Sequence, residues 1–161
     1  MDARINLFEN EIAAAFGKRF ANAALVIHRS SLPKATQELV SLRASQINGC
    51  GFCTDMHTKD ATAAGETAVR LNLVAAWREA TVFTEAERAA LALAEEGTRL
   101  ADAHHGVSDE TWAQVRKHYD DDQTAALVSL VALVNAANRI NVIARTPAGS
   151  YEPGMFDAMT S

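Results

Sequence analysis

The chain has two cysteines, Cys50 and Cys53, and a histidine, His57, follows four residues after the second. On a helix, positions i, i+3 and i+7 project from the same face. The spacing therefore predicts that both thiols and the imidazole form one cluster. A dithiol of this kind can open and close as a disulfide, and the neighbouring imidazole can take a proton from a thiol.

The two cysteines are expected to be activated in different ways. Cys50 is predicted to lie in the first turn of its helix, where free backbone N–H groups and the helix dipole favour a thiolate. Cys53 is predicted one turn further in, where the dipole is weaker, so it needs the base that His57 offers at i+4. A carboxylate behind the imidazole would fix its tautomer, and Glu38 is the candidate, because an antiparallel helix pair would place it beside His57.

Capping and hydrophobic patterns predict helices over nearly the whole chain and no alternating strand pattern. Ser31 and Pro33 are expected to open the second helix, and Asn48 is expected to cap the third. The predicted helices cover residues 10–28, 31–47, 48–65, 66–79, 84–101, 108–119 and 120–144, with an irregular tail after residue 147. We therefore expect one all-α domain over residues 1–161, a bundle of about six to eight helices.

The last predicted helix carries apolar residues around nearly its whole circumference. Such a helix must be buried on all sides, either at the centre of the bundle or at a subunit interface. This pattern favours a homo-oligomer, and a central helix of a monomer is the alternative. On the helix that carries the cysteines, Asp55 and Asp60 are expected to be solvated.

The composition excludes several classes of partner. The formal net charge is −5, the pI is about 5.5 and the basic residues are dispersed, so neither nucleic acid nor a membrane is an expected partner. Residues 1–9 contain no uninterrupted apolar run typical of a signal peptide, and the longest apolar stretch, 125–134, is too short to span a bilayer. A cytoplasmic location is expected, where a Cys-x-x-Cys pair is more often catalytic or metal-binding than a structural staple.

The cysteine pair has two other interpretations. Both thiols could be buried helix residues that act as small hydrophobes. A zinc site would use Cys50, Cys53 and His57, with Glu38 as a fourth ligand, but structural zinc sites usually draw on two cysteine pairs and this chain has one. We therefore expect neither a metal nor a cofactor. The adjacent His104 and His105 are expected to be surface residues.

Glu38, the two cysteines and His57 fall at the spacing found in the alkyl hydroperoxidase D (AhpD-like) family, within the carboxymuconolactone decarboxylase superfamily. The specific resemblance covers residues 38–65, and the flanking residues 46–49 and 58–61 agree with it. A later segment, 138–140, is similar to one common in small members of the family. The resemblance implies an all-helical fold, assembled as homo-trimers or hexamers, and a thiol peroxidase mechanism.

The resemblance also implies a role for each residue. Cys53 would be the peroxidatic cysteine, which becomes a sulfenic acid, and Cys50 would protonate the departing alkoxide and then close the disulfide. Glu38 and His57 would form the proton relay. Phe52 stands where some members carry a second histidine, which leaves the base role to His57 alone and makes the site more apolar.

The expected function is an antioxidant hydroperoxide reductase. Its substrate would be a hydroperoxide, and its reductant an external dithiol such as a lipoyl-bearing or thioredoxin-like protein. The alternatives are a decarboxylase-like acid–base enzyme of the same superfamily, which would not need the thiols, and a non-enzymatic oligomeric thiol redox sensor.

Overall fold

The computed structural model describes residues 2–7, 9–103 and 105–156, so the expectation for His104 lies outside the described residues. Over these ranges the chain forms seven α-helices, two short 3-10 helices and no β-strand, which confirms the all-α prediction. The helices are α1 (Glu11–His28), α2 (Lys34–Asn48), α3 (Gly51–Ala63), α4 (Ala68–Leu73), η1 (Val74–Ala76), α5 (Glu85–Thr98), η2 (Leu100–Asp102), α6 (Asp109–His118) and α7 (Asp121–Ala144).

The capping signals locate most helix starts. Thr84 and Glu87 form the predicted capping box at the start of α5, in which each side chain accepts a hydrogen bond from the other residue's backbone N–H. Asp120 and Gln123 form the corresponding box at the start of α7. The starts of α5 and α7 are therefore set by local side chains, as the sequence predicted.

Some predicted boundaries were wrong, two of them away from the cysteine pair. Ser31 lies outside α2, which begins at Lys34, because Pro33 has an extended ψ of 135° and acts as the residue before the helix. The helix predicted over 66–79 is shorter: α4 begins after Thr67, whose side chain caps it, and the chain tightens into η1 at Val74. Neither difference moves the cysteine pair.

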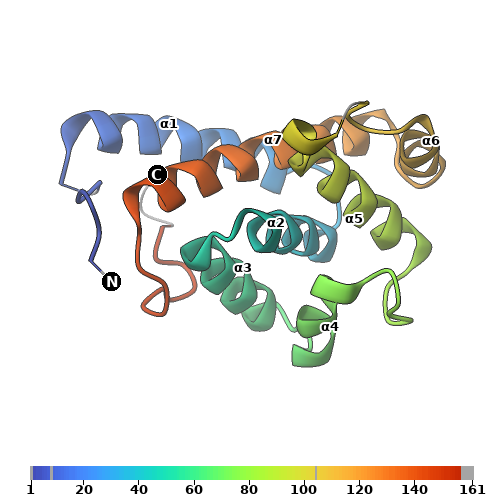
Figure 1. Ribbon diagram of the computed structural model, residues 1–161, viewed down its shortest axis with the longest axis horizontal. Helices are drawn as coiled ribbons and strands as arrows, with labels where there is room; N and C mark the ends of the chain where they lie inside the picture. The colour runs from blue at the N-terminus through green and yellow to red at the C-terminus, as the bar shows by residue number, and fades with distance from the viewer. Residues whose placement is uncertain (1, 8, 104, 157–161) are drawn as a thin grey trace.

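The centre of the bundle is α2, which packs against α3, α5 and α7 (Figure 1). The alternative that α7 is buried on all sides within one chain was wrong, because Val128, Val142 and Ile143 on its outer face are exposed. Burial of this face at a subunit interface stays a prediction. Figure 1 shows α1 and α7 running side by side along one edge of the molecule, and these two helices are in contact.

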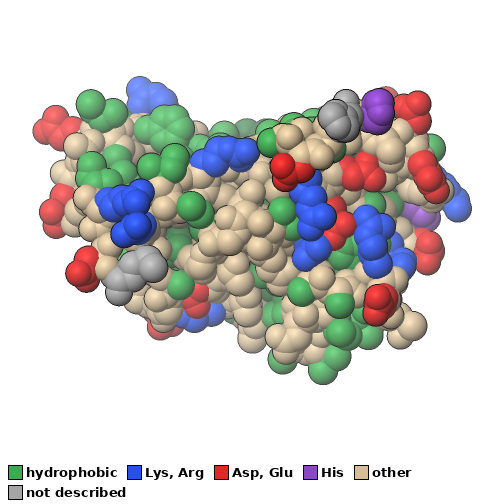
Figure 2. Space-filling model, viewed as in Figure 1, with side chains coloured by type: hydrophobic (Ala, Val, Ile, Leu, Met, Phe, Trp, Pro, Cys, Tyr) green, Lys and Arg blue, Asp and Glu red, His purple; other side chains and the backbone are tan. Residues whose placement is uncertain are grey.

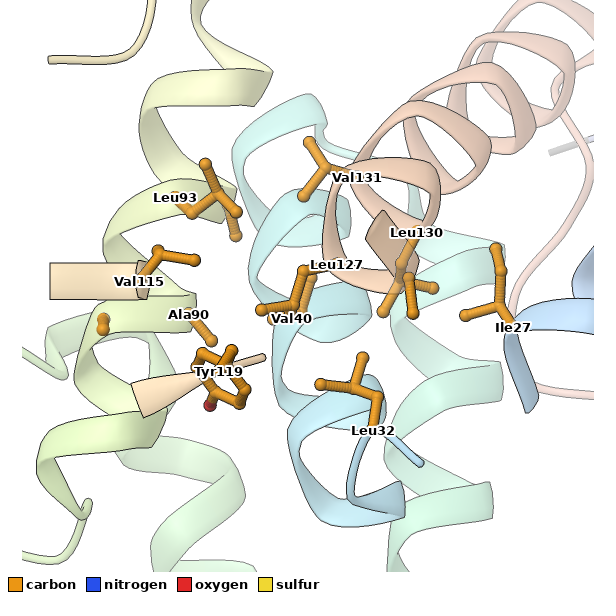
Figure 3. Packing of buried hydrophobic residues seen from close by; sticks show 13 residues of the cluster. Ile27, Leu32, Val40, Ala90, Leu93, Val115, Tyr119, Leu127, Leu130 and Val131 are labelled. Atoms are coloured by element: carbon orange, nitrogen blue, oxygen red, sulfur yellow. The ribbon is translucent and has the colours of Figure 1, made fainter. Parts of the chain in front are cut away.

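The main hydrophobic core lies between α2, α5, α6 and α7 and is closed by the end of α1 (Figure 3). Val40 from α2 and Leu127 from α7 meet at its centre and are fully buried. Tyr119 packs on the same core while its hydroxyl donates to the carbonyl of Ala86 at 2.8 Å. This packing holds α2, the helix that leads into the cysteine pair, between its neighbours.

A buried polar network joins the end of α2 to α7. The amide of Asn48 donates to Asn135 Oδ1 at 2.9 Å and to Asn138 Oδ1 at 2.8 Å. Asn138, which is fully buried, donates in turn to Ser45 Oγ at 3.0 Å. Because buried amides are costly to leave unpaired, the network fixes how α7 is rotated relative to the end of α2.

A buried ion pair joins α2 to α5. Glu95 accepts hydrogen bonds from Arg43 Nε at 2.8 Å, Trp77 Nε1 at 3.0 Å and Arg78 Nη2 at 2.9 Å. Burial alone would raise the pKa of Glu95, but the hydrogen bonds from these three donors outweigh it and hold that pKa below its ordinary value. Glu95 is therefore ionised in the folded protein.

Acidic and basic side chains are interspersed on the face of the molecule seen in Figure 2, in keeping with the dispersed charges of the sequence. Of the described helices, α7 is long and apolar enough, by length and composition, to cross a membrane. Core helices of soluble proteins pass the same test, and α7 packs here against α1, α2 and α5. The cytoplasmic location stays a prediction.

Candidate active site at the start of α3

The turn between α2 and α3 is a helix C-terminal motif built on glycine. Gly49 has a left-handed φ of 66° and donates to the carbonyl of Gln46 at 3.3 Å, while Cys50 N–H donates to the carbonyl of Ser45 at 3.0 Å. This pair of bonds is the Schellman pattern, which ends a helix and turns the chain sharply. The turn lays α3 against α2 and places Cys50 at the junction.

Cys50 is the N-cap of α3, and its Sγ accepts a hydrogen bond from Cys53 N–H at 3.2 Å. The prediction that Asn48 caps this helix was wrong, because Asn48 is the last residue of α2 and its amide binds α7. Cys53 is the third residue of α3 and so lies within its first turn, not one turn further in as expected. The helix dipole therefore acts on both sulfurs.

The two cysteines form a disulfide, with Cα atoms 5.4 Å apart. Each cysteine is only 1% exposed. A disulfide between residues three apart closes too short a loop to add much stability through chain entropy, so stabilising the fold is a poor explanation for it. The pair is chemically equipped for reversible oxidation and is shielded from solvent.

Glu38 and His57 are brought together from α2 and α3. Glu38 Oε2 lies 2.9 Å from His57 Nδ1, and the two side chains are 17% and 15% exposed. An ionised carboxylate can only accept, so His57 Nδ1 carries the proton and Nε2 of the neutral ring is left as an acceptor. Because His57 lies four residues after Cys53 on the same helix, the two side chains project from the same face of α3.

Asn141, on α7, is a contact of the site that the sequence analysis missed. Its Nδ2 donates to Cys53 Sγ at 3.6 Å and to the carbonyl of Ala137 at 3.0 Å. No local pattern points to this residue, because it lies 88 positions from Cys53 in the chain. In the structure, the buried Asn138, three residues earlier, shows that this face of α7 is turned toward α2.

The C-terminal segment 145–156, called the strap below, lies over α3. Asp55 accepts a hydrogen bond from Gly149 N–H at 2.8 Å, and Lys59 Nζ donates to the carbonyls of Gly149 at 3.1 Å and Tyr151 at 2.8 Å. Burial alone would raise the pKa of Asp55, but hydrogen bonds from Lys59 and Gly149 hold it below its ordinary value. The expectation that Asp55 is solvated was wrong.

Aromatic side chains of the strap close over the cysteine pair. Tyr151 is 4% exposed and packs edge-to-face on Phe52, with ring centroids 6.3 Å apart, and Phe156 completes the cluster. The Tyr151 hydroxyl donates to Asp60 Oδ1 at 2.9 Å, so Asp60 is also bound to the strap and is not a solvated residue as expected. The tail is irregular, as predicted, but it is packed.

His28, at the end of α1, is a further titratable group close to the Glu38–His57 pair. The pKa of His28 is lowered mainly by burial and secondly by the charge of Lys34, while the charge of Glu38 acts in the opposite direction. The sequence offered no partner for this histidine. In the folded chain it adds a second imidazole to the electrostatic surroundings of Glu38.

Within the described ranges, no group of three or more His, Cys, Asp and Glu side chains is placed to hold a metal ion. His105 is exposed.

The chain matches known proteins along most of its length. Residues 13–96 match the carboxymuconolactone decarboxylase family. The uncharacterized protein YdfG of Bacillus subtilis (strain 168) is 38% identical over 142 residues, which cover 88% of this chain and 94% of YdfG. A solved structure from Agrobacterium tumefaciens, described as a protein of unknown function and a candidate antioxidant defence protein AhpD, has a TM-score of 0.85 and 31% identity, and covers 93% of this chain and 100% of that one.

A shorter stretch matches an enzyme with a named activity. The alkyl hydroperoxide reductase AhpD of Rhodopseudomonas palustris (strain BisA53) is 44% identical over 77 residues, which are 44% of this chain and 41% of that protein. Together with the all-helical fold and the family match over residues 13–96, these similarities place the chain in a known group. It belongs to the carboxymuconolactone decarboxylase family, in the AhpD-like part of that superfamily.

Proposed function

We propose that this protein is a thiol-dependent hydroperoxide reductase. One observation carries the proposal: the Cys50–Cys53 disulfide lies at the N-terminus of α3, and the Glu38–His57 pair spans from α2 to the same helix. A dithiol with a helix dipole and an oriented imidazole has the groups needed to form a thiolate and to deliver a proton. The similarity to AhpD over 77 residues supports the same chemistry.

In the proposed first step, His57 Nε2 takes the proton of the Cys53 thiol, with Glu38 stabilising the imidazolium that forms. The Cys53 thiolate attacks the distal oxygen of the hydroperoxide, and the O–O bond breaks. Cys53 becomes a sulfenic acid, and the alkoxide leaves with a proton from Cys50, as an alcohol. The sulfur is oxidised by two electrons and the peroxide is reduced by two.

In the second step, the Cys50 thiolate attacks the Cys53 sulfenic acid. An S–S bond forms, the S–O bond breaks, and the hydroxyl group leaves as water after taking a proton from His57. An external dithiol then reduces the disulfide by thiol–disulfide exchange, and its own two thiols become a disulfide. A lipoyl-bearing or thioredoxin-like protein is the expected class of reductant.

We also propose that the protein acts as a homo-oligomer, with a trimer or hexamer expected. Ile12, Phe16 and Val26 are exposed apolar residues of α1, of which Ile12 is 82% and Phe16 54% exposed. Val142 and Ile143 on the neighbouring α7 are exposed as well. Exposed large apolar side chains on two neighbouring helices support an interface between protein chains. Light scattering after size exclusion, with Phe16→Asp as the disrupting variant, tests this.

Steady-state turnover of an organic hydroperoxide with a dithiol reductant tests the proposed activity. Turnover that disappears in both Cys53→Ser and Cys50→Ser supports it. Full activity toward an acid–base substrate in the double Cys→Ser variant would favour the decarboxylase-like alternative. Stoichiometric oxidation without repeated turnover would favour the redox sensor.

A further inference from the structure

The side-chain amide of Asn141 is oriented by the helix that carries it. Its Nδ2 lies 3.0 Å from the carbonyl oxygen of Ala137, one turn earlier in α7. A carbonyl oxygen only accepts hydrogen bonds, so the amide atom facing it is the nitrogen. The same nitrogen lies 3.6 Å from Cys53 Sγ. Asn141 therefore presents a donor, and not an acceptor, to this sulfur.

The position of Asn141 is also fixed by its neighbour Asn138, which is fully buried and bonded to Asn48 and Ser45 at the end of α2. Because α2 leads through Gly49 into the cysteine pair, the contact that locks α7 onto α2 also sets the distance between Asn141 and Cys53. The donor is held in place before any substrate arrives.

The two sulfurs receive different hydrogen bonds. Cys50 Sγ accepts from the backbone N–H of Cys53 at 3.2 Å, as an N-cap does. Helix geometry alone would therefore favour a thiolate at Cys50, in conflict with the role that the family resemblance implies for Cys53. Asn141 supplies Cys53 with the hydrogen bond that the helix start gives only to Cys50. A donor to the charged form of a group lowers its pKa.

We propose that Asn141 is the hydrogen-bond donor that stabilises the Cys53 thiolate and makes Cys53 the attacking sulfur. This inference rests on the proposed peroxidase function. It also assigns the direction of reduction. An external thiolate attacks Cys50 Sγ and forms a mixed disulfide there, while the S–S bond breaks and Cys53 leaves as the thiolate that Asn141 stabilises. A leaving thiol with a lower pKa leaves faster.

The test measures the thiol directly and does not require peroxidase activity. Cys53 is titrated alone in the Cys50→Ser background, where serine keeps the N-cap. The readouts are the pH dependence of iodoacetamide alkylation and the ultraviolet absorbance of the thiolate. Adding Asn141→Leu, which removes the donor, is expected to raise the pKa of Cys53 by about one unit, a roughly tenfold change in thiolate fraction below the pKa.

The pH dependence of the alkylation rate distinguishes the loss of the donor from a loss of packing. Because intrinsic nucleophilicity rises with thiol pKa with a Brønsted slope of about 0.4–0.5, the plateau rate of alkylation at high pH should increase about threefold, while the rate at pH values below the pKa of both forms should fall about threefold. The two profiles therefore cross. The matched control is Cys50 titrated alone in the Cys53→Ser background, where Asn141→Leu should leave the pKa unchanged.

Asn141→Asp is the second variant, because it keeps the shape of the side chain and places a carboxylate beside the sulfur. It should raise the pKa of Cys53 by more than Asn141→Leu does. An unchanged Cys53 pKa in folded Asn141→Leu or Asn141→Asp, or an equal shift in Cys50, would overturn the inference. A shifted Cys53 pKa in a protein that turns over no hydroperoxide would leave the role of Asn141 standing and remove the proposed function.

Discussion

Glu38 Oε2 and His57 Nδ1 lie 2.9 Å apart and join two helices that meet at the turn through Gly49. The two residues are 19 positions apart in the chain, and their side chains are largely buried. The carboxylate accepts a hydrogen bond from the proton on Nδ1 and so leaves Nε2 of the neutral ring as an acceptor. The proposed chemistry depends on this pairing.

Glu38→Gln keeps the shape of the side chain but removes its charge, so the imidazolium form of His57 loses its stabilising partner. We expect peroxidase kcat/KM to fall about 10-fold to 100-fold, with little change in the free energy of unfolding. Glu85→Gln, an exposed glutamate at the start of α5, is the matched control and should retain wild-type activity. Equal activity in Glu38→Gln and the control would remove Glu38 from the relay.

Gly49 and Gly51 flank Cys50 and should respond to alanine in opposite ways. Gly49 has φ +66°, where a Cβ is strained, so Gly49→Ala should lower the free energy of unfolding by about 1 kcal/mol. Gly51 lies in α3, and a Cβ there would meet only Ala148 Cβ at an ordinary 3.5 Å. Gly51→Ala should be neutral or slightly stabilising. Urea titration of both variants measures this, and equal destabilisation would contradict the left-handed turn at Gly49.

Tyr151 restricts access to the cysteine pair. Tyr151→Ala removes the ring that packs on Phe52, so the thiols of the reduced protein should react with iodoacetamide at least several-fold faster. Tyr151→Phe keeps the ring and loses only the hydrogen bond to Asp60, and should behave much more like wild type. If alkylation of Tyr151→Ala proceeded at the wild-type rate, the strap would not be the barrier to the site.

The Glu95 cluster should make the fold sensitive to acid. Because the pKa of Glu95 is lower in the folded chain than its ordinary value of 4.5, its contribution to stability is fully present above that value and is lost as the pH falls through the folded pKa. Glu95→Gln leaves Arg43 without its buried charged partner. The free energy of unfolding should therefore fall by about 3 kcal/mol at pH 7. The difference in free energy of unfolding between wild type and variant should shrink progressively below pH 4.5. A difference that stayed constant with pH would show that the charge of Glu95 does not stabilise the fold.

Local sequence was sufficient for the presence of the helices and for the part of the site built from one turn, although not for every helix boundary. Capping boxes such as Thr84–Glu87 are made by residues three apart, so their geometry follows from the sequence. The pairing of Glu38 with His57 needed only the assumption that helices on either side of Gly49 run antiparallel, which the helix ends at Asn48 and Gly51 made possible. Their roles in catalysis stay predictions.

Contacts between distant parts of the chain could not be predicted in this way. Asn48 was a reasonable N-cap by residue type, but its amide is engaged by Asn135 and Asn138 from α7, so the cap falls to Cys50. Asp60 was expected in solvent because its partner, Tyr151, comes 91 residues later. Tertiary contacts determine what Asn48 and Asp60 bind, and helical periodicity does not predict such contacts.

The most direct test of the central claim is a free-thiol titration of the reduced protein before and after one equivalent of an organic hydroperoxide, with intact mass measured alongside. We predict that both thiols disappear and that the mass falls by about two daltons, the two hydrogens lost when Cys50 and Cys53 join. Survival of both thiols, with no change in mass, would contradict the proposed peroxidase chemistry.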